Sequence, residues 1–101
     1  MDEGLVLLIS ENLRRVADER SFSLPTVLQR DTPLFGEGGI VDSLGLVTLI
    51  VSCEQAVEDE WGITISLADE KALSQRRTPF ATLGSMADYI RARMQAEGWN
   101  G

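Results

Sequence analysis

Residues 43–61 read SLGLVTLIVSCEQAVEDEW, and this stretch decides the fold because it predicts one long helix. It contains no proline and, after Gly45, no glycine, so nothing interrupts a helix about 27 Å long. Its apolar side chains recur every three or four residues and fall on one arc about 120° wide. The arc predicts a buried face made of Leu46, Leu49, Ile50, Cys53, Val57 and Trp61.

The same helix has a second row of apolar residues on nearly the opposite side, formed by Leu44, Val47 and Val51. Glu54 and Glu58 border this row. Exposed apolar residues with an acidic rim are typical of a docking surface for another protein. The alternative interpretation is that another helix of the chain covers the row.

The segments before the long helix predict an amphipathic helix and then a long connection. Apolar residues at helical spacing place the first helix from about residue 4 to residue 19. Residues 21–41 hold two prolines and three glycines, so we expect an irregular connection with a helical turn between Leu24 and Leu28. Such a connection needs apolar anchors in a small domain, and the candidates are Leu34, Phe35 and Ile40.

Downstream of the long helix, the sequence predicts two more helices. Gly62 is placed to end the long helix in a left-handed cap. Ser66 begins a weak capping box and opens a short third helix through about Ser74. Thr82 caps a last helix that ends before Gly98. We therefore expect a single all-α domain, a four-helix bundle with a long loop between the first two helices and a short third helix, over the whole chain of 101 residues.

Composition excludes much of enzyme chemistry. The chain has no histidine and one cysteine, so it cannot form an internal disulfide, a Ser-His pair, a Cys-His pair or a zinc site of the usual kind. That residue, Cys53, lies on the predicted buried arc and is expected to be unreactive. We expect no metal site, because no loop has the residue spacing of a calcium site. With no long apolar run and no signal-peptide pattern, we expect no membrane span and a cytoplasmic location.

Negative charge is concentrated in the middle of the chain. The net charge is -7, and no basic residue lies between Arg30 and Lys71, where nine of the sixteen acidic residues occur. Such a field repels nucleic acid and anionic membranes and attracts basic protein surfaces. We therefore expect basic protein partners and no nucleic acid. The alternative is that these acids form an ordinary solvated helix face.

The motif GIVDSL at residues 39–44 places Ser43 at the start of the long helix. The first turn of a helix presents partial positive charge and N–H groups without intrahelical acceptors. A phosphoryl group on the Ser43 hydroxyl would therefore lie in a favourable field. Asp-Ser-Leu alone occurs often by chance, and its specificity comes from the glycine-rich loop before it and the long helix after it.

From Leu5 to Ile90 the sequence resembles the acyl carrier proteins and the related carrier domains of polyketide and nonribosomal peptide synthesis. The best-matching segments are residues 39–44, 58–63 and 82–90. The resemblance implies that Ser43, flanked by Asp42 and Leu44, carries 4'-phosphopantetheine. A phosphopantetheinyl transferase would transfer this arm from coenzyme A with Mg²⁺. The arm's thiol would hold an acyl group as a thioester, and the chain would be a carrier with no catalytic residues.

The resemblance also implies the partners of such a carrier. Enzymes that load, build or transfer the acyl group would dock basic surfaces on the acidic long helix. The contact residues expected there are Leu44, Val47, Val51, Glu54 and Glu58, and the chain is expected to be a monomer.

Two features depart from the common pattern of this family. Gly45 and Thr48 stand where common members carry acids soon after the serine. Trp61 also lies about four residues farther from Ser43, which adds close to one helical turn and preserves the buried face. We therefore expect a specialised carrier in a dedicated fatty acid, lipid or polyketide pathway.

Three alternatives to an acyl carrier are open. The chain could carry an aminoacyl or peptidyl group, although an acidic long helix is more typical of acyl carriers. It could keep the bundle without modification and serve as a protein interaction module through Leu44, Val47 and Val51. A hydrolase that uses Ser43 is disfavoured, because the sequence supplies no histidine or well-placed lysine as its base.

Overall fold

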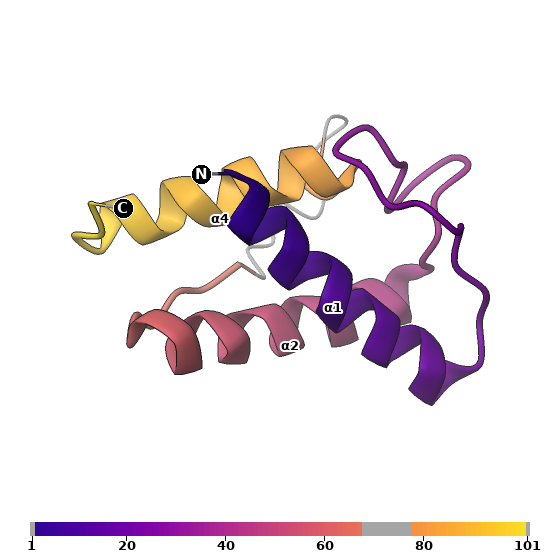
Figure 1. Cartoon of the computed structure of the whole chain (residues 1–101), viewed down its shortest axis with the longest axis horizontal. Coiled ribbons are helices and arrows are strands. Elements are labelled where there is room, and N and C mark those ends of the chain that lie inside the picture. Colours follow the sequence, from indigo (N-terminus) through magenta and orange to yellow (C-terminus); the bar gives the residue numbers. More distant parts are fainter. Residues whose placement is uncertain (1, 68–77, 101) are drawn as a thin grey trace.

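Three helices make up the described part of the chain, which comprises residues 2–67 and 78–100 of the computed structural model (Figure 1). α1 spans Asp2–Arg20, α2 spans Ser43–Trp61 and α4 spans Leu83–Ala96. Within those two ranges the extended pairing is limited to two isolated β-bridges, with no strand. The all-α prediction is confirmed, and so are the positions of the first, second and last helices.

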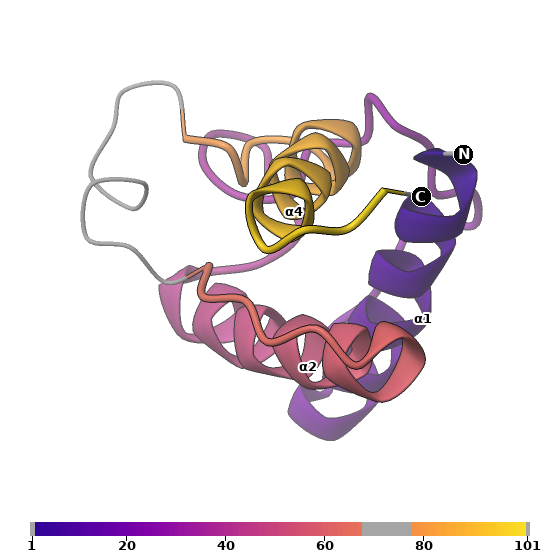
Figure 2. The same ribbon diagram turned by 90° about the vertical axis from the view of Figure 1, so that its left-hand side faces the viewer.

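α1 packs against both α2 and α4. In Figure 1, α2 and α4 run in the same direction across the view and α1 crosses them. Figure 2, turned by 90°, shows the three helices around a common centre. The largest fully buried side chains that the helices contribute are Leu5, Ile9 and Leu13 from α1, Leu46, Leu49 and Ile50 from α2, and Leu83, Met86 and Ile90 from α4.

α2 has the termini and the buried face that the sequence predicts. Gly62 ends it in a left-handed cap with φ of 69°, and the Gly62 N–H donates to the carbonyl of Glu58 at 2.8 Å. Glu60, whose sequence position falls within the buried arc, is exposed near the end of the helix. Of the predicted face, Leu46, Leu49, Ile50, Cys53 and Val57 are buried and Trp61 is half-buried.

The connection between α1 and α2 is attached to the first turn of α4. The N–H of Leu83 donates to the carbonyl of Thr32 at 3.2 Å, and the N–H of Gly84 donates to the carbonyl of Arg30 at 2.8 Å. The first N–H groups of a helix have no acceptor inside the helix. Here the connection supplies those acceptors, so it satisfies α4 and is held by it.

Leu34 is the main apolar anchor of the connection, as the sequence predicts. Its side chain is fully buried. Its N–H donates to the carbonyl of Ala81 at 2.7 Å, and its carbonyl accepts a 3.0 Å hydrogen bond from the N–H of Val41. The other two expected anchors, Phe35 and Ile40, are half-buried against the core. One buried leucine therefore ties the connection both to α4 and to the residues that lead into α2.

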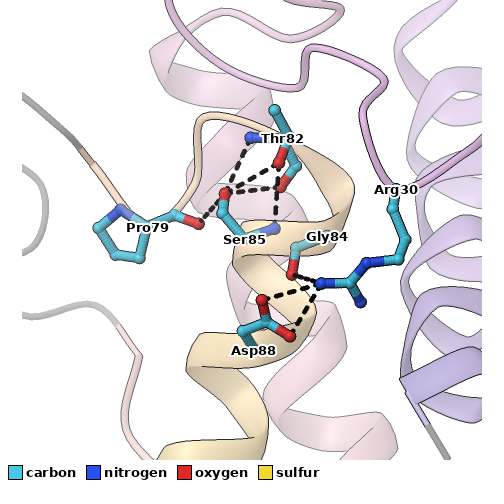
Figure 3. Close-up of polar contacts among 6 residues, drawn as sticks. All are labelled: Arg30, Pro79, Thr82, Gly84, Ser85 and Asp88. Carbon is cyan, nitrogen blue, oxygen red and sulfur yellow. Dashed lines mark hydrogen bonds and ion pairs between the residues drawn. The ribbon is translucent and has the colours of Figure 1, made fainter.

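The side chain of Arg30 extends this attachment along α4 (Figure 3). Its Nη2 lies 2.9 and 3.0 Å from the two carboxylate oxygens of Asp88 and 3.4 Å from the carbonyl oxygen of Gly84. Both charged side chains are about half exposed, at 48% and 57%, so the ion pair adds at most about 1 kcal/mol. The backbone hydrogen bonds, and not this pair, carry most of the attachment.

The first turn of α4 is also capped from within, by Thr82 and Ser85 (Figure 3). The Thr82 hydroxyl accepts from the N–H of Ser85 at 3.0 Å, and the Ser85 hydroxyl accepts from the N–H of Thr82 at 3.0 Å. This reciprocal pair is a capping box and confirms Thr82 as the cap of the last helix. The Ser85 hydroxyl also donates to the carbonyl of Pro79 at 2.8 Å.

Two predicted elements need comment. The helical turn expected between Leu24 and Leu28 is wrong, because the segment is irregular there, with a bend at Thr26 and Val27. Pro25 lacks the N–H that a helical turn would use, and it disfavours a helical backbone at Leu24. The expected third helix lies outside the described residues, except for Ser66 and Leu67, which belong to no helix.

Replacing Gly84 by alanine is expected to destabilise the protein, although alanine is the better helix former by about 1 kcal/mol. The new Cβ would lie 2.9 Å from the Arg30 carbonyl oxygen, so the connection must move off α4 at a cost of about 1–3 kcal/mol. Urea unfolding measures the change. Gly4→Ala is the control, because a Cβ at Gly4 in α1 meets nothing within 4 Å. Equal unfolding midpoints for the two variants would contradict this account.

Candidate functional site

The start of α2 is fixed by Asp42. This residue has the extended backbone of a helix cap, and its Oδ1 accepts a 2.7 Å hydrogen bond from the N–H of Gly45. Its carbonyl accepts from the N–H of Leu46 at 2.8 Å, which is the first hydrogen bond of the helix ladder. Ser43 is therefore the first residue inside the helix, and it is exposed.

Ser43 and Leu44 leave hydrogen-bonding groups open at this terminus. Among the described residues, nothing accepts a hydrogen bond from their N–H groups, and nothing bonds to the Ser43 hydroxyl. The helix dipole adds partial positive charge at the same place. An anionic group attached to the Ser43 oxygen would meet both a favourable field and N–H donors.

The structure explains why position 45 is a glycine, which departs from the common carrier pattern. It is buried, and a Cβ on it would lie 3.1 Å from Oδ1 of Asp42 and 3.3 Å from Cβ of Val41. The same Oδ1 accepts the 2.7 Å hydrogen bond from the Gly45 N–H. A larger acidic side chain at Gly45 would push against the residue that caps the helix.

The glycine-rich segment before Ser43 closes on itself. The N–H of Gly39 donates to the carbonyl of Gly36 at 2.9 Å, and Phe35 forms a β-bridge with Val41. A Cβ at Gly39 would lie 2.7 Å from the carbonyl oxygen of Leu34, closer than real Cβ atoms come. These contacts hold the residues directly before Ser43 against the backbone of the buried Leu34.

An open depression of about 360 Å³ is lined by Asp42, the residue directly before Ser43. Its other lining residues come from two parts of the chain, namely Arg20 and Phe22 at and after the end of α1 and Gly39, Ile40 and Val41 before α2. The turn that brings Phe22 here uses a left-handed Ser21, with φ of 58°, and a 3.0 Å hydrogen bond from the Phe22 N–H to the Ala17 carbonyl.

The second apolar row of α2 is exposed. Leu44, Val47 and Val51 have 60%, 45% and 59% of their surfaces accessible, so none of the described helices covers them. Leu7 of α1 is also 57% exposed, and it lines, together with Val51, a depression of about 690 Å³ between α1 and α2. Helical periodicity does not single out Leu7, because its neighbours Leu5, Leu8 and Ile9 are the residues that fit the buried stripe of the first helix.

The two acids expected beside this row have different environments. Glu58 is exposed. Glu54 is half-buried, and its Oε2 accepts a 2.6 Å hydrogen bond from the N–H of Leu67. Glu54 therefore fastens the segment that follows α2 back onto the helix. Glu11, Asp59 and Glu60 line the depression beside the row, together with one basic residue, Arg15.

Cys53 is fully buried in α2. Burial, with a smaller effect from the neighbouring Glu54 carboxylate, raises the pKa of its thiol to about 12. A thiol with so high a pKa is scarcely ionised near neutral pH and is a poor nucleophile. The prediction that Cys53 is buried is confirmed.

The chain was compared with known proteins in three ways. None of the protein-family models, curated proteins or solved structures with which it was compared matches it. Within the residues that the structure describes, no helix has the length and apolar character to cross a lipid bilayer. The same residues contain no group of three or more side chains suited to hold a metal ion. Function is therefore inferred from the residues around Ser43.

Removing the Asp42 cap is expected to lower the free energy of unfolding. Asp42→Ala deletes the acceptor of the Gly45 N–H and should cost about 1 kcal/mol. Asp42→Asn keeps an oxygen acceptor and should cost much less, because asparagine is an equally good cap. Urea unfolding of both variants measures the difference. Equal losses in the two would show that the charge of Asp42 matters and its hydrogen bond does not.

Cys53 is expected to resist iodoacetamide in the native protein and to react once urea unfolds the chain. Its folded pKa lies above the unfolded value of about 8.5, so the thiol contributes stability below that pH. This contribution is lost as the pH rises toward 12, by up to about 1.4 kcal/mol per pH unit. Intact mass follows the labelling, and urea unfolding at rising pH follows the stability, with Cys53→Ala as the control. Rapid native labelling would contradict the buried assignment.

Proposed function

We propose that this chain is a specialised acyl carrier protein that bears 4'-phosphopantetheine on Ser43. The observation that supports this most is the exposed Ser43 hydroxyl at the capped start of α2, beside unused N–H donors. The likeness of residues 39–44 to the carrier attachment motif agrees with it. The arm would hold an acyl group as a thioester in a dedicated fatty acid, lipid or polyketide pathway.

The chain's own part in loading is to present the hydroxyl. The Ser43 oxygen forms a new bond to the phosphorus of the phosphopantetheine group in coenzyme A. The bond between that phosphorus and the adenosine bisphosphate portion breaks, and the hydroxyl proton leaves to a base of the transferase. Asp42 is held by its bond to Gly45, so it keeps the helix start in place during this step.

The proposal includes a four-helix bundle. A short third helix between Leu67 and Ser74 would complete the bundle with the three described helices. The carrier would then be a single domain over the whole chain and a monomer in the cytoplasm. Its long loop between α1 and α2 would present Ser43 at one end of the bundle.

The proposed partners are the phosphopantetheinyl transferase and the enzymes that load, build or transfer the acyl group. Leu44, Val47 and Val51 would contact them, because these apolar side chains are exposed directly after Ser43. Glu58, and more weakly the half-buried Glu54, would face basic residues of the partner. Such charge pairing speeds encounter and weakens as salt rises.

Two alternatives retain support from the exposed row. The same surface could serve an interaction module that is never modified, and an aminoacyl or peptidyl carrier would use the same arm with a different load. Modification at Ser43 distinguishes an interaction module from a carrier. The mass of the loaded protein from its own host distinguishes an aminoacyl or peptidyl carrier from an acyl carrier.

Incubation with coenzyme A, Mg²⁺ and a broad-specificity phosphopantetheinyl transferase should add one phosphopantetheine arm to the chain. Ser43→Ala should gain nothing, whereas Ser23→Ala, which alters an exposed serine in the connection, should gain the arm as the native chain does. Intact mass gives the result. No gain in the native chain, or the same gain in Ser43→Ala, would contradict the carrier proposal.

The buried Cys53 provides a second readout of the same experiment. A maleimide should label the native modified chain once, on the arm, and should leave the unmodified native chain unlabelled.

A further inference from the structure

The depression beside Ser43 has no role in the presentation of the hydroxyl. Asp42, the residue directly before Ser43, lines it, whereas Ser43 does not, and its volume of about 360 Å³ lies at the lower end of the usual range for small-molecule pockets, about 300–1,000 Å³. None of Leu44, Val47 or Val51 lines it. A group attached to Ser43 could therefore enter it without covering the exposed row of α2.

The charges of this depression suit a phosphodiester. Such a group on Ser43 would carry one negative charge next to the carboxylate of Asp42, which repels it. Arg20 is the only basic residue among those that line the depression, and it forms no ion pair with a described carboxylate. Arg30, which lies in the connection, is paired with Asp88 at 2.9 Å. Arg20 is thus the cation placed to offset the added charge.

Two apolar side chains, Phe22 and Ile40, also line the depression. Phe22 and Ile40 are only half-buried, although both pack against the core with their inner faces. Their accessible faces line the depression together with the backbone of Gly39. The turn at Ser21 fixes the backbone of Phe22, from which the ring extends. An arm with a methyl-bearing, amide-containing chain would find apolar contact here and a cation at its phosphate end.

We propose that Arg20 pairs with the phosphodiester on Ser43 and that the pantetheine chain lies in this depression against Phe22 and Ile40. This inference rests on the proposed modification of Ser43. It makes Arg20 and Phe22 positioning residues for the arm. It also separates two surfaces: the resting arm lies on the loop side of Ser43, and the exposed row of α2 remains open to a partner.

The test uses the full chain, isotopically labelled and carrying an unlabelled arm from coenzyme A. NMR should detect nuclear Overhauser contacts between protons of the arm and the side chains of Phe22 and Ile40. Arg20→Gln should weaken or abolish these contacts and shift the phosphorus resonance. Arg14→Gln is the matched control, because Arg14 is an exposed arginine of α1 that lines neither depression described here, and it removes the same charge. The control should leave both signals unchanged.

The outcomes separate the two proposals. A chain that gains no arm by mass contradicts the carrier function and this inference together. A chain that gains the arm but shows no contact to Phe22 and Ile40, or contacts Leu44 and Val47 instead, contradicts only this inference. Equal behaviour of Arg20→Gln and Arg14→Gln would likewise overturn the pairing with Arg20. Rising salt should weaken the contacts in the native chain if an ion pair holds the phosphate.

Discussion

The attachment of the long connection to the first turn of α4 is the constraint on which the site depends. The carbonyls of Arg30 and Thr32 accept hydrogen bonds from the first two N–H groups of α4, and the buried Leu34 locks the same stretch to Ala81. These groups could not be left unpaired at a covered helix end without a cost of about 1–3 kcal/mol each. These hydrogen bonds therefore fix the position of the connection, even though it contains no helix of its own.

From that attachment the position of Ser43 follows step by step. Leu34 holds Val41 through a 3.0 Å hydrogen bond, Val41 precedes the cap residue Asp42, and Asp42 determines where α2 begins. The serine is thus placed by α4, which lies far from it in sequence. A disturbance at the start of α4 would be transmitted to Ser43 through the backbone, without any direct contact between the two.

The sequence predicts the features of this fold that depend on near neighbours in the chain. Helical periodicity gives all three described helices, and single residue types give their ends, as with Gly62 and Thr82. The burial of Cys53 follows from the same periodicity. The candidate attachment residue Ser43 was found because its motif and its helix adjoin one another, so no distant contact had to be known.

Features that depend on contacts between distant segments were not predicted. The role of Gly84 becomes clear only when the neighbour that would meet a Cβ is known, namely Arg30, which lies 54 residues away in the chain. The role of Glu54 was not predicted for the same reason, because its hydrogen bond to the Leu67 backbone cannot be inferred from its place on the helix. Arg20 and Phe22 share a depression with Asp42 because the chain turns at the left-handed Ser21, and serine gives no strong signal for that conformation.

The missing acids after Ser43 change how the proposed carrier would select its partners. Next to the serine, α2 presents Leu44 and Val47, and Thr48 uses its hydroxyl within the helix, donating to the Leu44 carbonyl at 2.9 Å. Apolar contact contributes roughly 25 cal/mol per Å² buried and depends little on salt, whereas exposed charge pairs are screened over about 10 Å at ordinary salt. Charge at the far end of α2, at Glu58, would then bring a basic partner to the helix. The fit of its surface to the apolar row would decide whether that partner stays at Ser43.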